Sequence, residues 1–172
     1  MINIVLKVNN MKIEDLMVYD WYYDVSICED KDDPNDKYRE ARQVGSIEHF
    51  QYNGDSEAIF RVNANLHYPQ NWLPTQDKNI RPIPLSDKFF KENGFEEYEV
   101  GENVVAYFRQ KDDECGLPIY DIEITHYKDH PTKWGVKIEK VSFLQKTIYS
   151  VDEFQRCLRI CGLEEIANNL KV

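Results

Sequence analysis

The sequence predicts an α+β fold, with a small antiparallel β module over residues 1–80 and a helix–antiparallel sheet–helix module over residues 81–172. Apolar and polar residues alternate over several short segments, which is typical of half-buried strands. Turn residues separate these segments, and two later segments carry complete signals for the start of a helix. Because 42% of the 172 residues are hydrophobic and 13% aromatic, the chain can build a packed core.

The first module is predicted from short strands joined by tight turns. Apolar and polar residues alternate over residues 2–8, which predicts the first strand. Further strands are expected over residues 21–27, 42–50 and 58–62, with a turn at residues 52–55. In the second strand, one face is expected to carry Trp21, Tyr23, Val25 and Ile27. This pattern predicts a small antiparallel sheet or a partly closed barrel.

A boundary between the two modules is predicted near residue 80. Residues 71–84 contain Pro74, Pro82 and Pro84 and show little periodicity. Proline lacks the backbone N–H that strands and helix interiors need, so this segment is expected to be a connection.

The second module is expected to open with a helix over residues 87–93. Ser86 is a suitable N-cap, because its hydroxyl can accept a backbone N–H of the first turn. Leu85 and Phe90 occupy the positions of a hydrophobic staple. Gly94 stands where a helix commonly ends in a left-handed residue.

Three strand segments follow and predict an antiparallel meander with one buried face. They cover residues 98–109, with a turn at 101–103, then 119–127 and 134–141. In the middle segment, one face is expected to carry Tyr120, Ile122, Ile124 and His126. Polar residues alternate with these four, as expected when one side of a sheet meets solvent.

The chain is expected to end in two helices that pack on the sheet. Ser150 and Glu153 match a capping box, in which each residue satisfies a backbone N–H of the first turn. An apolar stripe at helical spacing follows at Phe154, Cys157, Leu158 and Cys161. Gly162 is expected to end this helix before a short terminal one over residues 163–170.

Charge and composition exclude several classes of function. The net charge is −10, and neither module has the basic face that binding to a phosphate backbone requires, so direct nucleic-acid binding is not expected. No apolar stretch is long enough to span a bilayer, and the first eight residues lack the features of a secretory signal. Four cysteines show neither a CxxC pair nor zinc-finger spacing. These observations predict a cytoplasmic protein with no cofactor.

Several segments resemble a family of small bacterial proteins of unknown function. The opening of that family is similar to residues 11–21, and its middle and end are similar to residues 81–86, 92–95, 150–155 and 158–163. Members occur in gut anaerobes and sometimes near phage or mobile-element genes. Two departures are Tyr19, where the family has glycine, and residues 1–10, which precede the usual start. The resemblance implies an SH3-like barrel over residues 1–80, and it implies no activity and no catalytic residues.

Two segments have the composition of metal sites, but their spacing argues against metal binding. His126 and His130 are four residues apart, which suits zinc on a helix, yet His126 ends a predicted strand and Pro131 follows His130. A core or rim histidine and an exposed loop histidine are therefore expected. In the acidic segment over residues 29–36, Pro34 occupies a position where a calcium-binding loop needs a ligand. The segment also lacks the glycine that such a loop needs for its sharp turn. A solvated, mobile loop is expected there.

No catalytic motif is present in the sequence. Cys115 lies in a predicted loop beside Asp112, Asp113 and Glu114, whose negative charges disfavour a reactive thiolate. Neither a glycine-rich phosphate loop nor a Gly-x-Ser-x-Gly sequence occurs. The sequence therefore favours a protein without enzymatic activity.

Surplus aromatic residues favour a protein-interaction function. Residues of this kind in predicted loops or strand edges are Tyr38, Tyr52, Tyr68 and Trp72. Aromatic side chains with a polar group are enriched in interfaces, so we expect an unidentified protein partner. One variant is an acidic mimic of DNA that inhibits a nucleic-acid enzyme. The alternatives are a small-molecule-binding protein or hydrolase with a pocket near His126, and a subunit of a larger assembly.

Overall fold

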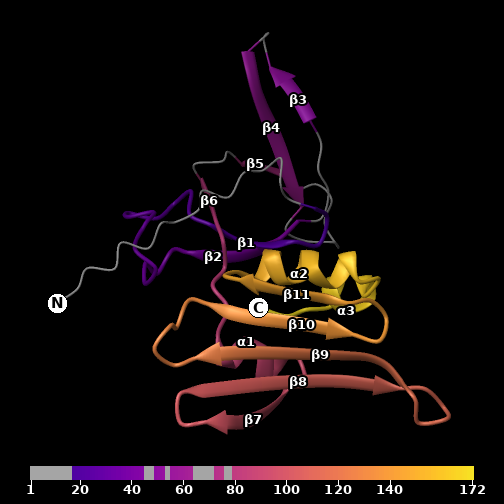
Figure 1. Cartoon of the computed structure of the whole chain (residues 1–172). Helices are drawn as coiled ribbons and strands as arrows, with labels where there is room; N and C mark the ends of the chain where they lie inside the picture. Colours follow the sequence, from indigo (N-terminus) through magenta and orange to yellow (C-terminus); the bar gives the residue numbers. More distant parts are fainter. Residues whose placement is uncertain (1–16, 45–48, 53–54, 64–71, 76–78) are drawn as a thin grey trace. The chain divides into compact units, whose positions relative to one another are not determined.

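The computed structural model describes residues 17–44, 49–52, 55–63, 72–75 and 79–172, with the backbone alone for residues 49–52, 55–63, 72–75, 99 and 100. The chain divides into two compact units, Met1–Ile83 and Pro84–Val172 (Figure 1). The sequence places this division three residues earlier, near residue 80. Among the described helices, none is both long and apolar enough to cross a membrane.

The first unit contains a three-stranded sheet in the order β2-β1-β6. Both outer strands are antiparallel to the central one, and the strands are β1 (Trp21–Asp24), β2 (Glu40–Gln43) and β6 (Ile80–Arg81). Tyr22, Val25, Val44 and Ile80 are buried there. Burial of these four side chains supplies the apolar contacts that hold the sheet.

The buried side of β1 differs from the sequence prediction. The strand buries Tyr22 and Asp24, whereas Ile27 lies beyond it and is 68% exposed. Asp24 can be buried because its carboxylate lies 3.3 Å from Nη1 of Arg42 and accepts a 2.9 Å hydrogen bond from the backbone N–H of Ser26. The four residues that alternate in the sequence therefore extend beyond the strand: Trp21 and Tyr23 are half-buried within it, and the buried Val25 follows it.

A second three-stranded sheet in this unit has the order β3-β4-β5. Its strands are β3 (His49–Tyr52), β4 (Asp55–Asn63) and β5 (Trp72–Thr75). The single strand predicted over residues 42–50 is thus replaced by β2 and β3 in separate sheets. The described strands of this unit form two open sheets, and an SH3-like barrel is not confirmed. The strand predicted over residues 2–8 lies outside the described residues.

The second unit is built on a five-stranded antiparallel meander with the order β11-β10-β9-β8-β7 (Figure 1). The strands are β7 (Glu96–Gly101), β8 (Val104–Asp112), β9 (Pro118–Tyr127), β10 (Trp134–Glu139) and β11 (Leu144–Ile148). The predicted meander is confirmed over β7 to β10. The sequence prediction missed β11, an edge strand whose Gln145, Lys146 and Thr147 are exposed.

Helices cover one face of this sheet, and the core between them is aromatic. The helices are α1 (Asp87–Glu92), α2 (Val151–Ile160) and α3 (Glu164–Asn168). The Phe90 ring of α1 lies 5.4 Å from the Tyr107 ring, 5.0 Å from Trp134 and 5.6 Å from Phe154, measured between centroids. Because Tyr107 and Trp134 come from the sheet and Phe154 from α2, Phe90 joins the two helices to the sheet.

The predicted helix ends are confirmed at α1 and corrected at α2. Oγ of Ser86 accepts a 3.2 Å hydrogen bond from the N–H of Phe89, and Gly94 has a φ of +77°. At α2, Ser150 is the N-cap residue, but its side chain makes no capping hydrogen bond. Glu153 instead accepts a 2.7 Å hydrogen bond from the N–H of Tyr149, one residue before the expected donor. The capping box is therefore incomplete.

Candidate functional site

The face of the five-stranded sheet opposite α1 and α2 is polar and partly exposed. In β9 the side chains alternate, so that Ile122, Ile124 and His126 are buried while Glu123 and Thr125 lie on the other side. The same alternation in β10 places Gly135, Lys137 and Glu139 on that other side. We call this side of the sheet the outward face.

A row of small side chains crosses the outward face from one strand to the next. Paired residues along the row are Ala106, Thr125, Gly135 and Thr147, from β8 to β11, and the large Tyr98 of β7 pairs with Ala106 at the end of the row. The neighbouring row carries larger side chains, namely Glu96, Phe108, Glu123, Lys137 and Gln145. Because the side chains of the first row are shorter than those of the neighbouring row, a depression runs across the strands.

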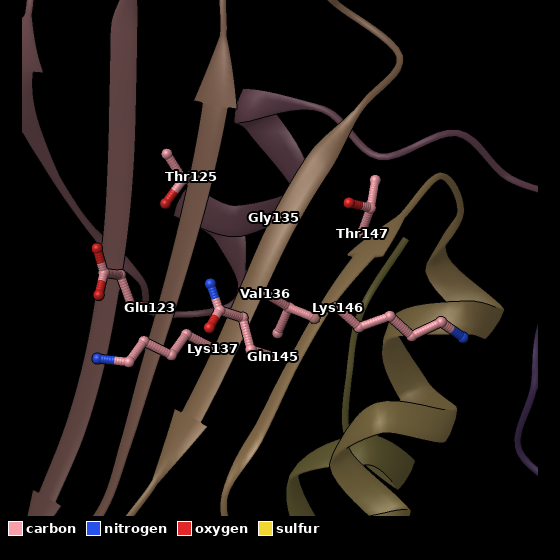
Figure 2. A pocket seen from close by; sticks show the side chains of 8 residues that line it. All are labelled: Glu123, Thr125, Gly135, Val136, Lys137, Gln145, Lys146 and Thr147. Carbon is pink, nitrogen blue, oxygen red and sulfur yellow. The ribbon is translucent and has the colours of Figure 1, made fainter.

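This depression is a hollow of about 400 Å³ over β9, β10 and β11. Its lining residues are Glu123, Thr125, Gly135, Val136, Lys137, Gln145, Lys146 and Thr147 (Figure 2). Figure 2 shows the Lys137 side chain directed towards Glu123, whereas Lys146 points away from both. The residues that line the hollow therefore carry one carboxylate, one amide, two hydroxyls and two amines, of which the Lys146 amine points away from Glu123.

Gly135 keeps the hollow open. A Cβ atom built on this glycine would lie 3.7 Å from Cβ of Thr125, an ordinary van der Waals contact. A side chain could thus be accommodated at this position without a clash, and its outer atoms would occupy the hollow. Glycine within a strand often marks a place where another group approaches the backbone closely.

The charges around the hollow favour a cation. Nζ of Lys137 lies 2.8 Å from Oε2 of Glu139. The pKa of the Lys137 amine is raised, first by its hydrogen bond with Glu139 and further by the charges of Glu139, Glu123 and Asp121. Tyr98 donates a 3.4 Å hydrogen bond to Glu123, and burial followed by the charge of Glu123 raises the pKa of that phenol. The outward face therefore has a negative potential near Glu123.

His126 lies on the opposite side of the sheet, against the helices. Its ring stacks on Trp134 at a centroid distance of 4.1 Å, and the residue is only 8% exposed. Nδ1 of His126 lies 3.7 Å from Oδ1 of Asp87, which also accepts a 2.7 Å hydrogen bond from the Tyr107 hydroxyl. Burial, followed by this hydrogen bond, raises the pKa of Tyr107. The prediction of a core or rim histidine is confirmed.

A histidine beside a carboxylate is the arrangement by which many hydrolases orient a general base. Here both ring nitrogens of His126 are buried and without a hydrogen-bond partner. His130 is exposed in the turn after β9, where its N–H donates a 2.9 Å hydrogen bond to the carbonyl of Tyr127. The described residues contain no group of three or more His, Cys, Asp or Glu side chains placed to hold a metal ion.

The acidic loop over residues 29–36 is exposed and uses its carboxylates in local hydrogen bonds. Oδ2 of Asp36 accepts from the N–H groups of Glu29 and Asp30, and its Oδ1 accepts from Tyr38. These bonds lower the pKa of Asp36, with the bond from Tyr38 contributing most. Asp32 forms a 2.9 Å ion pair with Arg81. The loop is thus attached to β6 by an ion pair.

The cysteines have different environments, and all four are free. Cys115 is exposed in a turn where Oδ1 of Asp113 accepts from the N–H groups of Cys115 and Leu117. Cys157 and Cys161 are buried, as the apolar stripe predicts. Burial raises the pKa of the Cys157 thiol to about 11.

Of the four aromatic residues selected from the sequence, Tyr52 and Trp72 are not brought together. Tyr38 is exposed in the segment before β2. Tyr52 pairs with Asp55 at one end of β4 and Trp72 pairs with Asn63 at the other, so their backbones are about 25 Å apart. Tyr68 lies outside the described residues, and the backbone alone is described for Tyr52 and Trp72.

The chain matches no protein-family model, no curated protein and no solved structure. The geometry of the second unit is therefore the basis for a functional proposal. Sequence reasoning missed the hollow, because its floor is formed by residues from separate strands. The available signal was Gly135 within a predicted strand, since glycine is uncommon there.

Proposed function

We propose that this chain is a non-catalytic interaction protein that binds a basic partner protein through the outward face of its five-stranded sheet. The observation that carries the proposal is the hollow beside Glu123, within an acidic face that also exposes tyrosine side chains. Protein interfaces combine aromatic contacts with complementary charge.

Two tyrosines on the outward face support a protein as the ligand. Tyr98 is 43% exposed and Tyr127 is 51% exposed, and Ile119 of β9 is exposed as well. Each tyrosine offers an apolar ring and a hydroxyl, which suits a surface that is wet when free and covered when bound. The net charge of −10 favours association with a basic protein over an acidic one.

Site-specific photo-crosslinking in the native host tests this proposal. A benzoylphenylalanine residue is placed at Tyr98 or Tyr127, and in a matched variant at Ile160, an exposed residue of α2. We expect one shared crosslinked protein from positions 98 and 127 and none from position 160. Equal crosslinking from all three positions, or crosslinking from position 160 alone, would refute the outward face as the binding surface.

A crosslinker at Tyr38 tests the surface selected from the sequence. The proposal retains Tyr38, Tyr52, Tyr68 and Trp72 as further candidate contacts, which the sequence places in the first unit. A partner captured from position 38 as well as from 127 would include that region in the interface. Loss of the complex on changing Tyr68 and Trp72 to alanine would extend the same conclusion to those two residues.

Three further parts of the proposal come from the sequence. The family resemblance suggests an SH3-like arrangement over residues 1–80 and a phage or mobile-element setting, and the cysteine pattern suggests the cytoplasm. One variant has the acidic loop imitate the phosphates of DNA. In that variant, reversing the charges of Asp30, Asp32 and Asp33 should abolish inhibition of a nucleic-acid enzyme.

A second candidate function is binding or hydrolysis of a small molecule near His126. The 3.7 Å approach of His126 to Asp87 supports this alternative, whereas the burial of both ring nitrogens favours the protein-binding proposal. Hydrolysis of p-nitrophenyl acetate by the wild type and its loss in His126→Gln would favour the alternative. Equal rates in the two proteins would remove it.

A further inference from the structure

The hollow on the outward face presents hydrogen-bond acceptors on more than one side. Glu123 borders it with a carboxylate that accepts one long hydrogen bond, 3.4 Å, from Tyr98. Thr125 and Thr147 place hydroxyls along its floor, and Gln145 places an amide at its rim (Figure 2). The hydroxyls and the amide can donate or accept, whereas the Glu123 carboxylate only accepts, so a positively charged group with several donors can bond to all of them.

We propose that the hollow binds an arginine side chain of the partner protein, with Glu123 accepting from the guanidinium and Gly135 leaving room for it. The inference rests on the proposed function and names the chemistry that the partner must present. It assigns Glu123, Gly135, Thr125 and Thr147 to recognition.

Arginine fits the hollow better than lysine does. A guanidinium is planar and carries five N–H donors, so it can bond to a carboxylate and to neighbouring hydroxyls together. A lysine amine carries three donors on one nitrogen, so it binds as a compact charge and cannot form the two parallel hydrogen bonds that a guanidinium makes with a carboxylate. The Tyr98 ring beside Glu123 adds an aromatic face on which a guanidinium can stack.

The amine already present on this face does not replace the proposed ligand. Nζ of Lys137 is held 2.8 Å from Glu139. Glu96, Asp121, Glu123 and Glu139 all lie in the two rows that follow the small-residue row, so carboxylates exceed amines there. The negative potential of these carboxylates would therefore attract an added cation. This charge complementarity favours a basic protein segment as the ligand.

The test measures binding of two labelled peptides, nona-arginine and nona-lysine, to the full chain by fluorescence anisotropy. We expect the arginine peptide to bind several-fold more tightly than the lysine peptide. Glu123→Gln should weaken arginine-peptide binding about tenfold, the usual effect of losing one charge-assisted hydrogen bond. Glu164→Gln removes the same charge from α3 and should change the dissociation constant less than about twofold.

A second variant separates the hollow from the general charge of the face. Gly135→Val keeps every charge and places a β-branched side chain in a strand, where such residues are favoured. It should fill the hollow and weaken arginine-peptide binding as much as Glu123→Gln does, with an unchanged or higher urea midpoint. If Gly135→Val misfolds, its urea midpoint will be lower than that of the wild type. The effect of Glu123→Gln on arginine-peptide binding then decides whether the hollow binds arginine.

Equal binding of the two peptides, or unchanged binding in both Glu123→Gln and Gly135→Val, would overturn the arginine proposal. The crosslinks from Tyr98 and Tyr127 would be unaffected by that outcome, so the protein-binding function would stand. Absent crosslinks together with selective arginine binding would instead refute the protein-binding function and leave the hollow as a guanidinium site.

Discussion

Asn93 and Lys171 exchange two hydrogen bonds although 78 positions separate them in the sequence. Nδ2 of Asn93 donates to the Lys171 carbonyl at 2.9 Å, and Oδ1 accepts from the Lys171 N–H at 2.8 Å. Nη1 of Arg109 in β8 also donates to the Asn93 carbonyl at 2.9 Å. A single buried residue, Asn93, thus links the end of α1 to the sheet through its backbone carbonyl and to Lys171 through its side-chain amide.

Asn93→Ala should lower the free energy of unfolding of the second unit by about 1–3 kcal/mol. The loss leaves a backbone N–H and a backbone carbonyl of Lys171 without their partner. Asn169→Ala is a matched control, because its exposed side chain donates to the carbonyl of Glu165. Urea unfolding should show a change of less than about 0.5 kcal/mol for the control. Equal effects in the two variants would contradict a special role for Asn93.

Phe90→Ala should destabilise the second unit by about 3–5 kcal/mol, because it leaves a cavity where Tyr107, Trp134 and Phe154 meet. Phe143→Ala removes the same atoms from a side chain that is 70% exposed and should cost less than about 0.5 kcal/mol. Thermal unfolding followed by near-ultraviolet circular dichroism measures both. A small effect at Phe90 would mean that the aromatic cluster does not hold the helices.

Asp24→Ala should destabilise the first unit by about 1–3 kcal/mol. Arg42 forms ion pairs with two carboxylates, the buried Asp24 and the exposed Glu40, and this variant removes the buried one. Glu40→Ala removes the exposed partner of the same guanidinium and should cost less than about 1 kcal/mol. Hydrogen exchange of the β1 and β2 amides reports on this unit directly. Faster exchange in Glu40→Ala than in Asp24→Ala would mean that the exposed carboxylate stabilises the sheet more than the buried one.

The stability of the second unit should fall as pH rises above about 9, in part through Cys157. The thiol of the unfolded chain ionises near 9.0, whereas burial raises its pKa to about 11 in the folded protein. Between these values the unfolded chain has released a proton that the folded chain keeps, so rising pH favours unfolding. The stability contributed by the neutral buried thiol is complete below pH 9 and is lost towards pH 11.

Urea unfolding between pH 8 and 10 checks this dependence. Cys157→Ala should be less stable at pH 8 through lost packing, yet its stability should fall less steeply with pH. Cys115→Ala, which changes an exposed thiol, should keep the wild-type slope. In the folded protein at pH 8, a thiol reagent should label Cys115 at once and Cys157 only after unfolding. Parallel slopes in all three proteins would exclude Cys157 as a source of the dependence.

Local signals in the sequence predicted the second unit well. The start of α1 was recognised from Ser86, whose hydroxyl accepts a backbone N–H of the first turn. The ends of α1 and α2 were recognised from Gly94 and Gly162, which adopt the left-handed conformation that ends a helix. Alternation in β9 and β10 gave the buried face of the sheet. These features depend on residues a few positions apart and could therefore be recognised without the fold.

Features that depend on distant partners were missed. The burial of Asp24 depends on Arg42, which lies in another strand, so hydrophobic alternation within β1 could not indicate it. The edge strand β11 has few apolar residues of its own and is defined by its pairing with β10. The hollow requires Thr125, Gly135 and Thr147 to be aligned across three strands. Such alignment is set by strand register, which no single segment specifies.

The meander of the second unit has a consequence for how this part of the chain is made. Its five strands lie side by side in the order in which they are synthesised, and short turns join them. Contacts between neighbouring segments form quickly, because little chain must be ordered to close them. The hydrogen bonds between Asn93 and Lys171 span 78 positions, so they can form only after all five strands have been synthesised. We expect the sheet to assemble by successive hairpins and the contact between Asn93 and Lys171 to form after them.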